Sequence, residues 1–247
     1  MRHMPGGQMK PKMFSLIVLG CFALLAAPGA SWAARAQDAK SPYPRMAPIE
    51  QYRMERSAEI ALARTAAPAS ISNNAGVMVL GRHGYETAVS GKNGFICVVE
   101  RAWNAPFDAP EFWNPKIRGP DCYNPQAVRS ILPLILKRAE WALAGLSKDQ
   151  MRERAKALAE KKELPPVEPG AMTYMMSKEA YLTDEGDHNM SHLMFYLPKG
   201  TDWGVGPHGS PVMQGQKDIV GTPEPITEFL IPVLRWSDGT PQIVGKH

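Results

Sequence analysis

Apolar and polar positions in this 247-residue chain follow two periods, and together they predict an α+β protein. Short apolar or alternating runs predict strands at 77–80, 85–89, 95–101, 171–176, 191–197, 219–220 and 227–234. Longer amphipathic runs predict helices at 48–64, 126–144 and 147–163. Because these elements do not repeat in βαβ order, we expect an antiparallel or mixed sheet with helices mainly on one face.

Single residues predict where helices break and begin. Pro133 lies inside the run 126–144 and is expected to kink or split that helix, because proline lacks the backbone N–H and crowds the preceding turn. Ser147 and Gln150 have the spacing of a capping box, which predicts a helix start.

The strand 95–101 is expected at the centre of the sheet. Its first residues, 95–99, are apolar without alternation, which is typical of a strand covered on both faces. Asn93-Gly94 precedes it, and this dipeptide between apolar runs predicts a hairpin with the strand 85–89.

Residues 1–36 have the pattern of a secretory signal peptide. A basic start precedes an apolar run at 13–27, and small residues lead to Ala34-Arg35-Ala36. The apolar run is shorter than the roughly 20 residues that cross a bilayer, which favours cleavage over anchoring. Residues 37–247 are then expected to form a single α+β domain, periplasmic or secreted, with no membrane span.

Removing the leader changes the charge balance. The chain has 28 Lys and Arg against 24 Asp and Glu, and the leader holds four of the basic residues and no acidic one. The mature domain is therefore close to neutral, without a basic stripe to neutralise phosphates. We expect no nucleic acid partner, and a small molecule or an envelope protein instead.

Only Cys97 and Cys122 remain after the leader, which takes Cys21 with it. Two cysteines in an oxidising compartment predict one disulfide, and the alternative is a buried pair of thiols. Closing a loop of this length contributes roughly 3 kcal/mol, much of it by restricting the unfolded chain.

Three histidines close together in the sequence form the candidate metal site: His188, His192 and His208. Alternation in the strand 191–197 places His192 on one face with Met194 and Tyr196. The strand 171–176 is expected to add Met172, Tyr174 and Met176 to that surface. Imidazole with thioether suits copper, and imidazole with the nearby carboxylates suits zinc. The alternative is a hydrogen-bonded buried His192 with methionines filling core space.

Loops supply the candidate ligand-binding residues. Arg82 and His83 occupy a turn between predicted strands, Trp113 belongs to the aromatic loop 102–124, and His208 lies in a Gly-rich loop. Such loops border ligand clefts, although tight-turn polarity and a packed flap explain the same residues. Residues 204–209 match G-x-G-x-x-G by letters, but Pro207 denies the pattern its helix. The sequence contains no enzyme motif that would decide between an enzyme and a binding protein.

Four runs, IALARTAAPASIS, VMVLGRHGYETAVSGKNGFICVVERAW, FWNPKIRGPDCYNP and SHLMFYLP, resemble those of uncharacterised exported bacterial proteins. The resemblance covers about residues 59–240 and implies export and a single shared domain, but no activity, cofactor or catalytic residue.

The leading hypothesis is an exported domain that binds a small ligand or a protein partner in a cleft between the sheet, the loop 102–124 and the loop 200–216. The alternative is a zinc- or copper-dependent enzyme or metal-handling protein that uses the histidine cluster. A third is an envelope interaction protein without a pocket, which would show an exposed apolar patch.

Overall fold

The computed structural model describes residues 41–185, 190–202, 204, 213–215 and 224–242. Within these residues the chain forms one eight-stranded sheet in the order β2-β1-β3-β4-β5-β6-β8-β7. Strands β1 and β3 are parallel, and every other neighbouring pair is antiparallel. The predicted α+β class with a mixed sheet is confirmed.

The strands are β1 (Gly76–Leu80), β2 (Tyr85–Val89), β3 (Ile96–Glu100), β4 (Gly119–Tyr123), β5 (Met172–Met175), β6 (His192–Pro198), β7 (Met213–Gly215) and β8 (Ile226–Pro232). The helices are η1 (Ile49–Gln51), α2 (Arg56–Arg64), α3 (Ala69–Ser72), η2 (Ala102–Asn104), α4 (Pro125–Ser130), α5 (Leu132–Leu143) and α6 (Lys148–Glu160).

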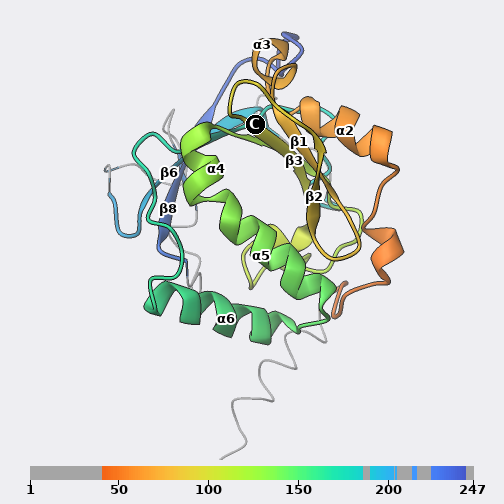
Figure 1. Cartoon of the computed structure of the whole chain (residues 1–247), viewed down its shortest axis with the longest axis vertical. Coiled ribbons are helices and arrows are strands. Elements are labelled where there is room, and N and C mark those ends of the chain that lie inside the picture. The colour runs from red at the N-terminus through yellow and green to blue at the C-terminus, as the bar shows by residue number, and fades with distance from the viewer. Residues whose placement is uncertain (1–40, 186–189, 203, 205–212, 216–223, 243–247) are drawn as a thin grey trace, which may run out of the picture.

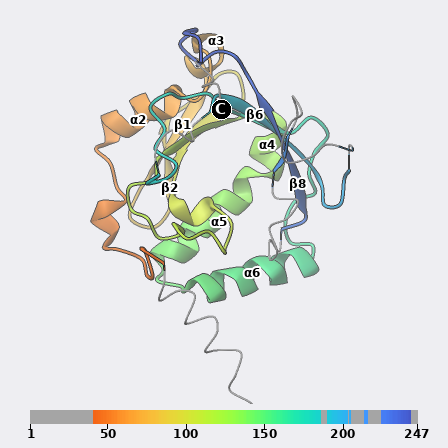
Figure 2. The same ribbon diagram turned by 180° about the vertical axis from the view of Figure 1, so that it is seen from behind.

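The sheet curves around α4 and α5, as Figures 1 and 2 show from opposite sides. We call the side toward these helices the inner face. Helix α6 lies beyond α5 on the same side, in accord with helices mainly on one face, while α2 packs on the outer face against β1, β3 and β4.

Alternation along the strands separates two cores. Val77, Cys97 and Cys122 belong to the outer core under α2, and Val98 and Tyr123 belong to the inner core under α4 and α5. The central strand β3 is therefore covered on both faces, as its unbroken apolar run predicted.

The aromatic loop after β3 forms a third core cluster. Trp103, Phe107 and Phe112 are at most 2% exposed and pack with Tyr52 and residues of α5 and α6. Most of these side chains therefore belong to a packed flap, which was the alternative to a loop that borders a ligand cleft.

The first α-helix begins at Arg56, after the short 3₁₀ helix η1, so the prediction of one helix from residue 48 is wrong. Glu55 caps α2 by accepting a hydrogen bond from the Ala58 N–H at 3.0 Å. The preceding segment turns inward instead, because Tyr52 is fully buried and its hydroxyl donates to the Trp113 carbonyl at 2.7 Å.

The hairpin predicted between β2 and β3 is also wrong. Strand β2 pairs with β1, and β3 pairs with the opposite edge of β1. The connecting residues cross the start of β1, where the Asn93 amide donates to the Ile71 carbonyl at 2.8 Å. Gly91 makes this crossing possible, since a Cβ there would overlap the backbone of Gly76.

Strand β4 was missed because its residues, Gly119-Pro120-Asp121-Cys122-Tyr123, have low strand propensity. Pairing with β3 along its whole length compensates, and Cys122 lies directly opposite Cys97. The predicted disulfide joins these two residues. Strand β7 was missed too, and the strand predicted at 219–220 lies outside the described residues.

The residues expected to break and to begin helices do so in the structure. The chain breaks between α4 and α5 next to Pro133, as predicted. Helix α6 begins with the predicted capping box, in which Ser147 Oγ accepts from the Gln150 N–H at 3.3 Å and Gln150 Oε1 accepts from the Ser147 N–H at 2.9 Å.

Candidate functional site

A cavity of about 850 Å³ lies between α5 and the inner face of the sheet. Its walls are mainly apolar, and the lining also includes residues near 42, 109–111 and 182–185. The apolar lining comes from α4–α5 and the sheet: Ile131, Leu134, Ile135, Met175, Met194 and Ile226. Its volume is within the range of small-molecule sites, about 300–1,000 Å³.

Strand alternation brings acidic side chains into this apolar space. Glu100 ends β3 on the same face as Val98, and Glu228 is the register partner of Tyr196 across β6 and β8. All three of Glu100, Tyr196 and Glu228 line the cavity. Carboxyl groups surrounded by apolar walls lose hydration, which favours their neutral form.

Glu100 and Asp121 show this effect. The Tyr123 hydroxyl donates to Glu100. Asp121 is fully buried, and neither of its carboxyl oxygens has a hydrogen-bond partner among the described residues, although the nearby Thr173 and Tyr123 hydroxyls lower its pKa slightly. Burial raises the pKa of Glu100 and raises that of Asp121 far above its ordinary value. We therefore expect both carboxyls to hold their protons to higher pH than exposed carboxyls do.

Glu228 titrates near neutrality. Burial, with a further contribution from the charge of Glu100, raises its pKa to about 7. Glu228 keeps some accessible surface because it lines the cavity. Its charge therefore changes around physiological pH and can respond to what occupies the cavity.

Arg138 and Glu224 form a buried ion pair at one end of the cavity. Arg138 comes from α5, and its Nη1 donates to the carbonyls of Trp103, Asn104 and Ala105 at 2.8–3.2 Å. Arg138 Nε, Glu224 Oε2 and Asn104 Oδ1 are buried without a hydrogen-bond partner among the described residues. Buried polar atoms without partners are costly, so this end of the cavity is suited to a polar group.

Asp184 links three segments of the chain beside the cavity. It accepts hydrogen bonds from the Tyr43 hydroxyl, from the Tyr181 hydroxyl at 2.5 Å and from Lys116 Nζ at 3.1 Å. These donors, Tyr181 first, lower the pKa of Asp184, so it is charged at every physiological pH. The segment around Tyr43 is thereby joined through Asp184 to the segments that carry Lys116 and Tyr181.

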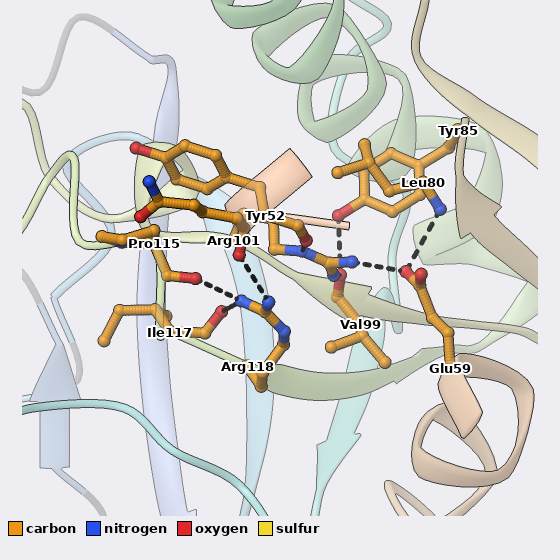
Figure 3. A network of polar contacts seen from close by, with 10 residues as sticks. Tyr52, Glu59, Leu80, Tyr85, Val99, Arg101, Pro115, Ile117 and Arg118 are labelled. Carbon is orange, nitrogen blue, oxygen red and sulfur yellow. Dashed lines mark hydrogen bonds and ion pairs between the residues drawn. The ribbon is translucent and has the colours of Figure 1, made fainter. Parts of the chain in front are cut away.

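A second buried ion pair supports the end of β3 (Figure 3). Arg101 Nη2 lies 2.8 Å from Glu59 Oε1, and both side chains are at most 1% exposed. Arg101 Nε also donates to the Tyr52 carbonyl at 2.7 Å, and Glu59 accepts from the Leu80 N–H at 3.1 Å. The network ties α2, β1 and η1 to the residue that follows Glu100.

Arg118 extends this network by donating to backbone carbonyls. Its Nη1 donates to the carbonyls of Pro115 and Ile117, each at 2.7 Å (Figure 3). Burial, then the charge of Arg101, lowers the pKa of Arg118 to about 10, so it is a cation at neutral pH. The two guanidinium groups lie among backbone carbonyls, which points to a structural role.

The predicted ligand-binding residues do not gather at this cavity. Arg82 and His83 are exposed in the turn between β1 and β2, and Trp113 is buried in the aromatic cluster. None of these three lines the cavity. His208 lies outside the described residues, and its predicted role stays a prediction.

His192 matches the alternative to a metal ligand. It is 5% exposed, its Nδ1 lies 2.7 Å from the Met190 carbonyl, and burial lowers its pKa, so it is a neutral hydrogen-bonded histidine. Within the part of the chain that the structure describes, no three His, Cys, Asp or Glu side chains are grouped to hold a metal ion. His188 and His208 lie outside that part, so the zinc or copper site stays a prediction.

Alternation along β6 was predicted correctly, since Met194 and Tyr196 line the cavity together. The expected neighbours on β5 were wrong, because Thr173 and Met175 pair with Met194 and His192. By alternation along the strand, Met172, Tyr174 and Met176 therefore lie on the face opposite the inner face. The register of the β5–β6 pair decided this.

No family model, no curated protein and no solved structure matches this chain.

Among the described residues, no helix has both the length and the apolar character to cross a membrane. The disulfide fits an oxidising compartment. The predicted signal peptide lies outside the described residues, so export stays a prediction.

The unliganded protein is expected to lose stability as pH rises from 5 to 8. The folded state holds the Glu228 proton up to about pH 7, whereas the unfolded carboxyl releases it near 4.5, so stability falls between these values. Glu100 and Asp121 act in the same direction. His192 opposes them below pH 6.5, because burial lowers its pKa.

Glu228→Gln should remove about 2 kcal/mol of this loss. Urea unfolding followed by tryptophan fluorescence at pH 5.5 and 8 measures it. Glu153→Gln, which removes an exposed carboxylate on α6, is the control. Equal losses of stability in wild type and Glu228→Gln would contradict the prediction.

Proposed function

We propose that this chain is an exported binding protein whose ligand is a small, mainly apolar molecule with one polar end. The ligand occupies the cavity between α5 and the inner face of the sheet. The observation that carries the proposal is the combination, in one space of about 850 Å³, of apolar walls with buried polar atoms that have no described partner.

The apolar walls supply the affinity in this proposal. Transfer of apolar ligand surface from water contributes about 25 cal/mol per Å², so a ligand burying roughly 200 Å² gains about 5 kcal/mol before the costs of association. Side chains from α5, β5 and β6 surround such a ligand: Leu134, Ile135, Met175 and Met194.

The polar end supplies orientation. Asn104, Arg138 and Glu224 hold buried donors and acceptors whose partners are not among the described residues. A ligand that bonds to them offsets their desolvation, and a ligand without a polar group leaves them unsatisfied. This arrangement of an apolar pocket with few convergent polar groups is typical of small-molecule sites.

The loop 102–124 supports the proposal of a cleft beside it. It contributes Asn104, Ala105 and Pro106 to the cavity lining. The loop 200–216 lies mostly outside the described residues, so its part in the cleft stays a prediction.

Filling the cavity is expected to abolish binding. Ile135 is partly buried and lines the cavity, so Ile135→Trp places a large ring where the ligand lies. Lys137→Trp, on the same helix but outside the lining, is the matched control. The uncharged fluorescent probe N-phenyl-1-naphthylamine reports binding by its increase in emission.

Wild type and Lys137→Trp should bind the probe, and Ile135→Trp should bind it at least tenfold more weakly while keeping the same circular dichroism spectrum. Absence of probe binding to the wild type, or equal binding to Ile135→Trp, would overturn the proposal.

A further inference from the structure

Acidic residues outnumber basic ones among the described residues that line the cavity. Two arginines belong to this lining, Arg101 and Arg138. Each already has an acidic partner, Glu59 for Arg101 and Glu224 for Arg138. The described lining includes six acidic residues: Glu100, Glu111, Asp184, Glu185, Glu224 and Glu228.

We propose that the polar end of the ligand is an organic cation, a protonated amine, held against Glu100, Glu224 and Glu228. This inference rests on the proposed function and names the chemical class of the ligand.

The geometry of the polar end favours a donor. Asn104 and Arg138 each act on the titration of Glu100, and Arg138 contacts Glu224, so these groups lie together. Glu224 Oε2 and Asn104 Oδ1 are buried acceptors without a described partner. An ammonium group has three N–H donors and no acceptor, which matches such a site.

An anionic ligand fits the same end poorly. Arg138 is its cation, but Nη2 contacts Glu224 and Nη1 donates to three carbonyls. Only Nε lacks a partner among the described residues. A ligand carboxylate would therefore gain one donor while approaching Glu100 and Glu228, and like charges in a poorly hydrated space repel strongly.

Binding of a cation should release protons. Glu228, with a pKa of about 7, and Glu100, with a raised pKa, hold their protons to higher pH in the empty cavity than exposed carboxyls do. A cation beside them favours the carboxylates, so one bound ammonium displaces up to one proton from each. Groups that act on these two carboxyls are Asp121 and Tyr123 of β4, Tyr196 of β6, and Arg138 of α5. Affinity for the cation should therefore rise with pH.

Three probes with one chain length separate head-group charge from apolar burial. Decylammonium, 1-decanol and decyl sulfate compete with N-phenyl-1-naphthylamine at pH 7.5 and 5.5. An alkylammonium stays charged at both values, because its pKa is about 10. We expect decylammonium to bind at least tenfold more tightly than decanol at pH 7.5, decyl sulfate to bind most weakly, and the ammonium preference to shrink at pH 5.5.

The variant Glu228→Gln tests whether Glu228 contributes to the preference for the ammonium probe. It should reduce the ammonium preference at least fivefold and change decanol affinity less than twofold, while Glu153→Gln leaves both unchanged. Glu228→Gln removes a carboxyl that is unfavourable when ionised, so the variant is expected to fold.

Equal affinity for decylammonium and decanol, or tightest binding of decyl sulfate, would overturn the cation and leave the proposed function standing. Binding of no probe at all would overturn both. An unchanged ammonium preference in Glu228→Gln would remove Glu228 from the site and overturn the inference as stated.

Discussion

Replacing Arg101 with methionine is expected to lower the free energy of unfolding by about 3–5 kcal/mol. The change leaves the Glu59 carboxylate in a site that is 1% exposed, without the guanidinium 2.8 Å away. It also removes the hydrogen bond to the Tyr52 carbonyl. Urea unfolding followed by tryptophan fluorescence measures the loss.

Two further variants separate burial from charge. Arg129→Met breaks an ion pair with Glu168 in which the arginine side chain is 57% exposed, and should cost far less than Arg101→Met, because water screens exposed charges. Adding Glu59→Gln to Arg101→Met removes the buried charge and keeps an acceptor for the Leu80 N–H, so part of the stability should return. Similar losses for Arg101→Met and Arg129→Met would show that burial does not decide the cost.

Loss of the disulfide is the second large effect. The double variant Cys97→Ala, Cys122→Ala should be less stable by about 3 kcal/mol, because the unfolded chain regains the freedom that a closed loop denies it. Both sulfurs are fully buried between β3, β4 and α2. Denaturant unfolding with and without dithiothreitol measures the effect.

Reductant should bring the wild type to the midpoint of the double variant and leave the double variant unchanged. The bond is buried, so reduction requires prior unfolding and samples must be equilibrated in denaturant. A reduced wild type as stable as the oxidised one would contradict the prediction.

The candidate site shows where sequence reasoning stops. Histidines were singled out because imidazole is a common metal ligand, and His192 proved to be a buried group bonded to a backbone carbonyl. The cavity uses carboxyls instead. One signal was present: Glu228 lies inside the apolar run Ile226–Pro232, and Glu100 ends the apolar run of β3. An acidic residue buried in an apolar strand destabilises the folded state unless it has a partner, so its presence there can indicate a function.

Asp121 had no such signal. It lies in Gly119–Tyr123, a segment whose glycine and proline argue against a strand. Only pairing with β3 makes it extended and buries it. Its raised pKa therefore follows from long-range contacts rather than from its neighbours in the chain.

The sequence by itself determined what depends on near neighbours. Pro133 divides α4 from α5, Ser147 and Gln150 cap α6, and the unbroken apolar run of β3 predicts an interior strand that is covered on both faces. Backbone hydrogen bonding within one turn, and the burial of one strand, are local properties.

Tertiary structure alone decided the strand order and the cavity. Three features depend on contacts between segments far apart in the chain. They are the edge of β1 that pairs with β3, the face of β5 that meets Met194, and the curvature of the sheet around α5. Curvature brings Glu100 of β3, Glu228 of β8 and Arg138 of α5 to one apolar space. The titration of those groups is then set by burial and by each other, which no local pattern of residues encodes.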